Sequence, residues 1–293
     1  MSVKVLLDTD IGTDIDDAVC LAYLLVHPDC ELLGITTVTG EPEKRAMLAS
    51  AICRRAGRDV PIYPGAERPL VVEQKQTRAQ QAEALGSWDH QNAFPRGEAI
   101  EFMRETIRSH PGEVTLLSIA PLTNLGLLFS VDPEIPSLLK GLVMMCGLFK
   151  GPIPKYGPLE WNAIGDPHAT AIVYRAHVLL HRSIGLDVTT SVNMSPEDFR
   201  NTFRSDLFKP IQDFADIWFR DWPGTTFHDP LAAATIFDRN ACGFTKGYVE
   251  IELTDQQSLG FTRWTEDPAG GHEVAFEVNP AAFFEHFIST VHP

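Results

Sequence analysis

Residues 6–18 read LLDTDIGTDIDDA, which places five aspartates within ten positions directly after an apolar run. Carboxylates this close repel one another, and removing them from water is costly. The N-terminus of a following helix stabilises one or two acidic side chains through its backbone N–H groups and its dipole. The remaining acids need a counter-charge. The stretch therefore predicts a site for a hard divalent cation, because Ca²⁺ takes about 6–8 oxygen ligands and Mg²⁺ about six.

The segments around this stretch alternate between strand and helix patterns. Strand patterns occupy residues 3–9, 31–38 and 60–65, and helix patterns occupy residues 16–27 and 42–57. The first strand is apolar throughout, as expected for a strand covered on both faces. Strand–helix alternation implies a parallel sheet with right-handed crossovers. We therefore expect an α/β fold with an open, mostly parallel, Rossmann-like sheet flanked by helices.

The rest of the chain continues this alternation with two less regular regions. Helix patterns cover residues 98–110, 121–131, a segment from Pro167 and residues 280–291, and strand patterns cover 113–120 and 139–147. Residues 71–96 are polar and rich in glutamine, which indicates a long surface excursion. Residues 195–222 are expected to be helical, and the last sixty residues to hold two or three strands before the closing helix. With no repeat or linker, residues 1–293 are expected to form one domain.

Composition excludes several classes of partner. The formal net charge is −15, which argues against binding nucleic acid or an anionic membrane and favours a neutral or cationic small molecule. From these residues we expect no signal peptide and no membrane-spanning segment, and the five cysteines are scattered without a CxxC pair. We therefore expect a cytoplasmic protein without zinc or disulfides.

The first strand places Asp8 and Asp10 at its carboxyl end, where open α/β sheets bind ligands. One family with a DxD pair there, the haloacid-dehalogenase phosphatases, also needs a later acidic pair. The nearest candidate, GDPHAT at 165–170, lacks the second acid. The sequence therefore argues against a phosphatase of that kind.

A second family fits the acidic turn and seven further segments, in the correct order. DTDIGTDIDDA resembles the aspartate-rich turn of the inosine–uridine-preferring nucleoside hydrolases, a turn that binds Ca²⁺. The similarity continues through the segments ELLGITTVTG, PGAERPL, SIAPLTNLGLLF, LVMMCG, LEWNAIGDPHAT, GLDVT and FHDPLAAA. This resemblance implies Ca²⁺-dependent hydrolysis of the N-glycosidic bond of ribonucleosides, releasing a purine or pyrimidine base and ribose.

The resemblance also implies roles for individual residues. Asp10 would act as general base and His228 as the acid that protonates the leaving base. The metal ligands would be Asp10, Asp16, Asp17, Asp229 and the Thr123 carbonyl. The residues that bind substrate would be Asp16, Glu41, Met145, Glu160, Asn162 and Asp229. Family members are usually dimers or tetramers, which implies a homodimer or homotetramer here.

Two departures from the family pattern affect these assignments. Two extra residues separate Gly12 from the Asp16–Asp17 pair, so Asp14 competes with that pair as a ligand; we prefer the pair because it adjoins Ala18 at the helix start. Glu41 stands where the family often has asparagine. We hypothesise that this acid favours a cationic or otherwise unusual nucleoside.

Other readings of these residues remain open. A protein that binds ribosyl groups with a metal but does not cleave them is one alternative, and a hydrolase of a modified ribosyl compound is another. Trp161, Phe227 and Trp264 either flank the base or pack in the core. Asp132 and Asp166 each precede a proline, which is typical of a helix start.

Overall fold

The computed structural model describes residues 2–154, 156–238 and 240–292. The strands are β1 (Val3–Thr9), β2 (Cys30–Thr37), β3 (Ile62–Pro64), β4 (Val114–Ser118), β5 (Gly141–Met144), β6 (His181–Ser183), β7 (Asn193–Met194), β8 (Thr225–Thr226), β9 (Cys242–Ile251), β10 (Thr262–Glu266) and β11 (His272–Val278). The longer helices are α1 (Asp16–Val26), α2 (Pro42–Arg55), α3 (Ala99–Ser109), α4 (Thr123–Val131), α7 (Pro167–Tyr174), α10 (Lys209–Trp218), α11 (His228–Phe237) and α12 (Pro280–Val291). Shorter helical segments are η1 (Gln80–Ser87), α5 (Ile135–Leu138), α6 (Trp161–Gly165), α8 (Leu186–Thr189), α9 (Pro196–Thr202) and η2 (Asp206–Phe208).

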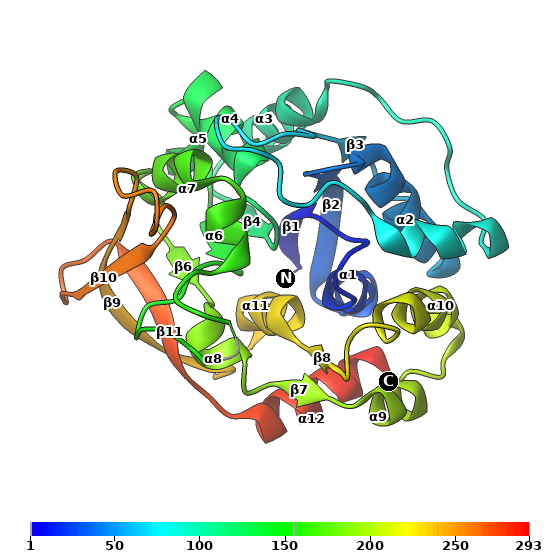
Figure 1. The fold of residues 1–293 in the computed structure, drawn as a ribbon. Coiled ribbons are helices and arrows are strands. Elements are labelled where there is room, and N and C mark those ends of the chain that lie inside the picture. Colours follow the sequence, from blue (N-terminus) through cyan, green and yellow to red (C-terminus); the bar gives the residue numbers. More distant parts are fainter. Residues whose placement is uncertain (1, 155, 239, 293) are drawn as a thin grey trace.

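Within these residues, nine strands form one sheet in the order β10-β9-β11-β6-β5-β4-β1-β2-β3. Pairing is parallel from β3 across to β11, and β9 and β10 extend one edge in antiparallel fashion. Helices cover both faces of the sheet (Figure 1). The expected open, mostly parallel α/β fold is confirmed.

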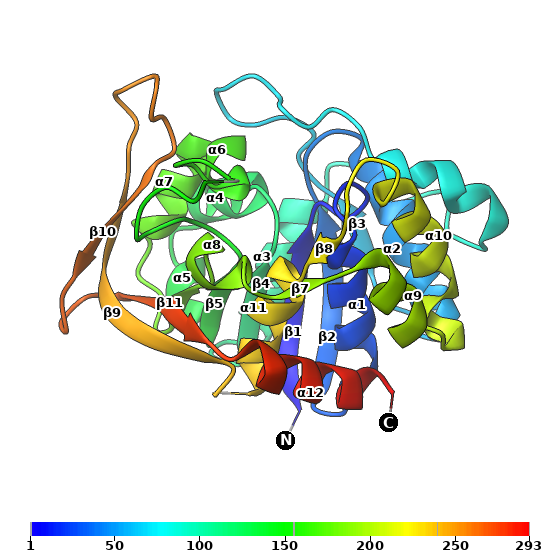
Figure 2. The ribbon, with the colours of Figure 1, turned by 60° about the horizontal axis from the view of Figure 1, so that its bottom comes forward.

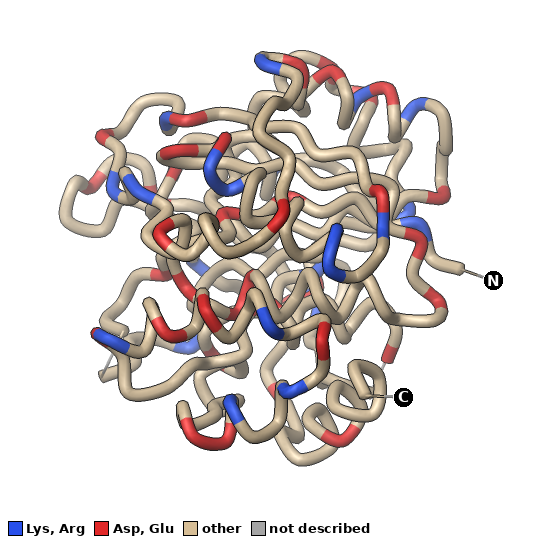
Figure 3. The backbone as a smooth tube through the Cα atoms, turned by 90° about the vertical axis from the view of Figure 1, so that its right-hand side faces the viewer, with Lys and Arg blue, Asp and Glu red and all other residues tan. Residues whose placement is uncertain are grey.

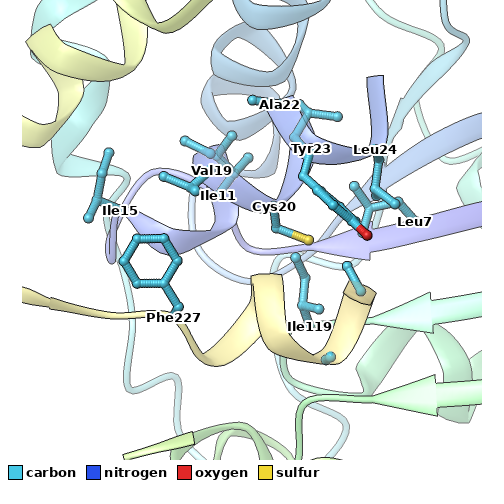
Figure 4. Packing of buried hydrophobic residues seen from close by; sticks show 14 of the residues in the cluster. Leu7, Ile11, Ile15, Val19, Cys20, Ala22, Tyr23, Leu24, Ile119 and Phe227 are labelled. Atoms are coloured by element: carbon cyan, nitrogen blue, oxygen red, sulfur yellow. The ribbon is translucent and has the colours of Figure 1, made fainter. Parts of the chain in front are cut away.

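The central strand explains why both faces are covered. Successive side chains of β1 point to opposite faces, so Val5 and Leu7 join one hydrophobic cluster and Leu6 joins the other. The first cluster includes most of α1, with Cys20 and Tyr23 among its buried residues, and Phe227, the residue just before α11 (Figure 4). A strand buried on both sides has no polar face, which accounts for its continuous apolar sequence.

The order of the strands creates a crevice beside β1. From β1 the chain builds β2 and β3 on one side, and then returns to build β4, β5 and β6 on the other side. Asp8 of β1 lies opposite Ser118 of β4 at the carboxyl end of this pair. In Figure 2 these strands rise from the N-terminus, and their carboxyl ends lie toward the top of the view. Ligands of open α/β sheets bind where the strand order reverses in this way.

Two regions differ in regularity from the central sheet. Residues 71–96 are an irregular excursion that contains only η1, as expected. The helical prediction for residues 195–222 is only partly correct, because the segment divides into α9, η2 and α10. Ser195 caps α9 through the Asp198 amide, and Pro210 occupies the first turn of α10, so each helix has its own start.

Charged residues of both signs are interspersed on the side of the protein shown in Figure 3. None of the helices in the described ranges has the length and apolar character needed to cross a bilayer.

Asn124, near the start of α4, joins three parts of the carboxyl edge of the sheet. Its side-chain amide donates to Asp8 Oδ1 (2.7 Å) and to the Thr37 carbonyl (3.1 Å), and its oxygen accepts from the Ala66 amide (2.9 Å). Gly65 makes this approach possible, because a Cβ there would lie 2.4 Å from the Asn124 oxygen. Burial raises the pKa of Asp8 to about 7 even though the Thr36 and Asn124 hydrogen bonds lower it.

We predict that Asn124→Ala lowers the free energy of unfolding by about 2–4 kcal/mol, because it removes one of the hydrogen bonds to the buried Asp8 carboxyl group and leaves the Ala66 amide and the Thr37 carbonyl without these partners. Urea denaturation of the purified protein measures this change. The matched control is Asn92→Ala at an exposed position, where we expect a change within about 0.5 kcal/mol. Equal stability of the two variants would contradict the linking role of Asn124.

Candidate active site

Three carboxylates from distant parts of the chain meet beyond the carboxyl end of β1. Asp16 and Asp17 lie in the first turn of α1, and Asp229 lies in the first turn of α11. Each offers an oxygen within 4.8 Å of the oxygens of the other two, and all three side chains are buried. The Asp229 amide donates to Asp16 Oδ2 (3.0 Å), which joins the two helix starts directly.

The positions of these acids explain how the fold tolerates them. Both helix N-termini carry partial positive charge from their backbone N–H groups, and that charge favours nearby anions. This effect is insufficient for the whole cluster, because burial first and the neighbouring carboxylates second raise the pKa of Asp16, Asp17 and Asp229 well above the usual range. A cluster of buried, mutually repelling oxygen donors fits a hard divalent cation.

Asp10 lies in the turn between β1 and α1, beside this cluster. Its Oδ2 accepts a hydrogen bond from Gln76 Nε2 (2.8 Å), and its carbonyl accepts one from Arg45. Burial raises the pKa of Asp10, while the positive charge of Arg45 and the Gln76 hydrogen bond lower it. Its charge also raises the pKa values of Asp16 and Asp17, which shows that the groups share one electrostatic environment.

Arg45 supplies the buried positive charge of the site. It lies in α2, is fully buried, and its guanidinium donates to the carbonyls of Asp10, Ile11, Gly40 and Arg78 and to the Thr13 hydroxyl. Arginine has five N–H donors in a planar fork, so one side chain can hold a turn from several directions. Arg45 therefore stabilises the acidic turn between β1 and α1, which contains the two extra residues between Gly12 and Asp16.

The other predicted metal ligands differ in their surroundings. Asp14 lies outside the three-carboxylate cluster and lines an adjoining cavity, which favours the Asp16–Asp17 pair as ligands. Thr123 begins α4, and its hydroxyl donates to Asp166 Oδ2 (2.9 Å). Asp166 caps α7 through the Ala169 amide, so its predicted helix-start role is confirmed. The helix-start prediction is wrong for Asp132, because α5 begins at Ile135 with Glu134 as its N-cap residue. The Asp132 carboxylate instead forms a bidentate ion pair with Arg108.

Three predicted substrate-binding residues are adjacent. Glu160 caps α6 and accepts hydrogen bonds from the amides of Gly147, Asn162 and Ala163. Asn162 donates to the Met145 carbonyl (2.9 Å). Glu160, Asn162 and Met145 therefore form one connected unit at the end of β5.

Glu41 is the N-cap residue of α2 and has a left-handed backbone conformation with φ of 60°. Its carboxylate pairs with Lys44 (2.6 Å) and accepts from the Ala79 amide (2.9 Å). Partial burial raises the pKa of Glu41, but the hydrogen bonds from Lys44 and Ala79 and the positive charges of Lys44 and Arg78 together lower it by more, so the group is ionised. The charge of Glu41 is thus partly balanced within the protein.

An aromatic cavity of about 380 Å³ adjoins the acidic cluster. Tyr156, Trp218, Trp222, Asp14 and His228 are among its lining residues. The two indoles stack with their centroids 5.0 Å apart, and Trp218 is fixed by a hydrogen bond to the Gly224 carbonyl (3.1 Å). His228 Nδ1 lies 2.7 Å from the Thr189 hydroxyl, which orients the imidazole.

The aromatic residues that line this cavity differ from those considered from sequence as contacts of the base. Phe227 is fully buried in the core, and Trp264 packs against Phe149 and Phe276 at the antiparallel edge of the sheet. Core packing is therefore the correct reading for both. Sequence reasoning missed Trp218 and Trp222, which lie on either side of a turn without a recognisable motif.

The three buried carboxylates and His228 lie beyond the carboxyl ends of the parallel strands, where open α/β sheets bind their ligands. The sequence model of the inosine-uridine preferring nucleoside hydrolases matches residues 5–285, and the chain belongs to that family. It is thus a nucleoside hydrolase, an enzyme that hydrolyses N-glycosidic bonds.

Individual relatives cover nearly the whole chain. A probable uridine nucleosidase 1 from Oryza sativa subsp. japonica is 30% identical, with 92% of this chain and 90% of that protein aligned. Uridine nucleosidase 1 from Arabidopsis thaliana is 29% identical over 89% of this chain and 83% of its own length. Among solved structures, a purine-preferring ribonucleoside hydrolase from Gardnerella vaginalis shares the fold with a TM-score of 0.85 at 22% identity, covering 98% of both chains.

We predict that, without divalent cations, the free energy of unfolding of the protein is lower at pH 8 than at pH 6. The three clustered carboxylates have pKa values raised above the unfolded value of 3.8, so the folded chain binds more protons than the unfolded chain. Its stability therefore falls as the pH rises through those raised values, by about 1.4 kcal/mol per pH unit for each titrating group. Added Ca²⁺ should restore about 2.7 kcal/mol at one hundred times its dissociation constant.

Thermal unfolding with EDTA and with Ca²⁺ at both pH values measures this effect. The control is the double variant Asp16→Asn, Asp17→Asn, in which both the pH dependence and the gain from Ca²⁺ should shrink. An undiminished Ca²⁺ gain in that variant would place the cation elsewhere.

Proposed function

We propose that the protein is a Ca²⁺-dependent ribonucleoside N-ribohydrolase in which Asp10 is the general base and His228 protonates the leaving base. The observation that carries this proposal is the meeting of buried Asp16, Asp17 and Asp229 beside Asp10 and next to His228. Asp10, Asp16, Asp17, Asp229 and the Thr123 carbonyl are the proposed ligands. When bound, Ca²⁺ supplies the charge that balances the acids, holds the ribose hydroxyls and lowers the pKa of the attacking water.

Cleavage of an N-glycosidic bond develops positive charge on the ribose ring. The acidic cluster favours that charge, because carboxylates in a low-dielectric site interact strongly with a nearby cation. Asp10 takes the proton from the water that attacks the anomeric carbon, and its burial keeps it sufficiently basic for this role. The chain thus provides both stabilisation of the ring and activation of the nucleophile.

The departing base carries away the electrons of the broken bond and needs a proton. Because His228 Nδ1 is bonded to the Thr189 hydroxyl, Nε2 is the nitrogen that delivers this proton. The imidazole and the aromatic cavity adjoin each other, which supports the cavity as the place where the base is held. Stacking on Trp218 or Trp222 would bind any planar base.

The sugar is bound by residues on both sides of the cluster. Asp16 and Asp229 approach the ribose hydroxyls from the helix starts, and Met145, Glu160 and Asn162 approach from the end of β5. Glu41 is proposed to influence the outer part of the sugar from α2. A site that pairs polar groups with the ribose diol discriminates against a 2′-deoxy substrate, since that substrate leaves those groups unpaired.

The decisive experiment is release of free base from a panel of nucleosides, with EDTA and with added Ca²⁺. The panel contains inosine, uridine, cytidine, adenosine, nicotinamide riboside and 2′-deoxyinosine. We expect Ca²⁺-dependent cleavage of at least one ribonucleoside and at least about 100-fold slower cleavage of the deoxy compound. Calcium binding without any cleavage would instead support the ribosyl-binding alternative.

We predict that His228→Ala and Asp10→Asn separate the two proton transfers. Each variant should lower kcat for the best nucleoside by about 10²–10⁴-fold. With p-nitrophenyl riboside, whose leaving group departs without protonation, His228→Ala should regain most of its activity while Asp10→Asn should remain impaired.

Steady-state kinetics of both variants with both substrates measures this difference. His168→Ala serves as the control, because His168 lies in α7, outside the residues assigned to the site. Equal losses of His228→Ala on the two substrates would refute its role as acid.

A further inference from the structure

Gln76 is an unusual residue in its segment. It belongs to the polar excursion between β3 and η1, where its neighbours Lys75 and Thr77 are exposed, yet only 7% of Gln76 is accessible. This part of the chain follows β3 and lies at the top of Figure 2, on the side where the parallel strands end. A long polar side chain loses considerable rotamer freedom when it is buried, so its contacts must compensate for that loss.

The carboxamide of Gln76 uses its hydrogen-bonding groups in three directions. Nε2 donates to Asp10 Oδ2 (2.8 Å) and to the Thr13 hydroxyl (2.7 Å), and Oε1 accepts from Trp161 Nε1 (2.7 Å). An indole nitrogen can only donate, and an ionised carboxylate can only accept. The partners therefore fix the orientation of the amide. In the flipped orientation the amide oxygen would face the Asp10 carboxylate and the amide N–H groups would face the indole N–H.

The backbone around Gln76 is tied to the sheet edge at several points. The Gly40 amide donates to the Gln76 carbonyl (3.1 Å), the Leu70 amide to Asp166 (2.7 Å) and the Ala79 amide to Glu41 (2.9 Å). These contacts hold the segment across the ends of β1 and β2. Gln76 is thus presented to Asp10 by a braced segment.

We propose that Gln76 is a positioning residue that orients the Asp10 carboxylate and, through Trp161, couples it to the sugar-binding unit of Glu160 and Asn162. This inference rests on the proposed function, in which Asp10 accepts the proton of the attacking water. The carboxylate of Asp10 rotates about a broad torsion, and a fixed donor at Oδ2 restricts that rotation. Trp161 stands between Glu160 and Asn162 in sequence, so the same amide sets the start of α6.

The test compares Gln76→Glu with Gln80→Glu. The first replacement is isosteric but removes both N–H donors, and the second adds the same charge at an exposed position four residues along the chain. We expect Gln76→Glu to lower kcat by about 10- to 100-fold, the range for a lost hydrogen bond to a charged group. KM should change by less than about threefold, because the group acts through Asp10 and does not hold the substrate.

Gln76→Leu is the second variant, since it removes the donors without adding charge. It should lose kcat to a similar extent while its thermal midpoint stays close to that of the wild type. Kinetics of Gln76→Glu and Gln76→Leu that match Gln80→Glu would overturn the proposal. So would a loss confined to KM, which would indicate direct contact with substrate.

A measurement independent of activity tests the link to Trp161. The chain has five tryptophans, so an NMR spectrum of the ¹⁵N-labelled indole groups shows separate signals, and Trp161→Phe identifies the one from Trp161. We expect Gln76→Leu to shift that signal and leave the Trp264 signal unchanged. An unshifted Trp161 signal would overturn the coupling even if activity falls. A wild-type protein that cleaves no nucleoside would instead overturn the proposed function, and the catalytic part of this proposal with it.

Discussion

The burial of like charges at the meeting point of two helices is the constraint on which the rest of the site depends. Asp16, Asp17 and Asp229 are brought together by the N-termini of α1 and α11, which supply partial positive charge at the right place. Arg45 adds a full positive charge from α2 and holds the intervening turn by its backbone carbonyls. The strand order, the helix starts and the buried arginine can thus be understood as parts of one electrostatic arrangement.

The fold was largely predictable because its signals are local. The continuous apolar run of β1 and the strand–helix alternation after it are sufficient to predict a parallel sheet with both faces covered. The segment 195–222 was harder, because its aromatic residues suit one long helix as well as several short ones. The starts at Ser195 and Pro210 are local signals for its division, but the stacking of Phe203 on Phe208 between the two helices forms only in the folded chain. Local pattern alone does not contain that information.

The site was predictable in part for the same reason. The acidic turn is a contiguous motif, and Asp229 and His228 follow one another in sequence. Arg45, Gln76 and Asn124 were missed because their partners lie far away along the chain. A signal for Arg45 does exist: it shares a helical stripe with Leu48, Ala49 and Ile52, all of which are buried. An arginine at such a position requires buried acceptors, and the acidic turn is the place to look for them.

The hydrogen bond between the Asp229 amide and Asp16 joins residues 213 positions apart. In an unfolded chain, bringing such distant segments together carries an entropic cost that grows with the logarithm of the loop length. During synthesis, the first acidic turn emerges long before its partner, and only the arrival of α11 completes the cluster. A cation held by both helix starts would therefore close this long loop, fastening the first and last thirds of the chain much as a cross-link does.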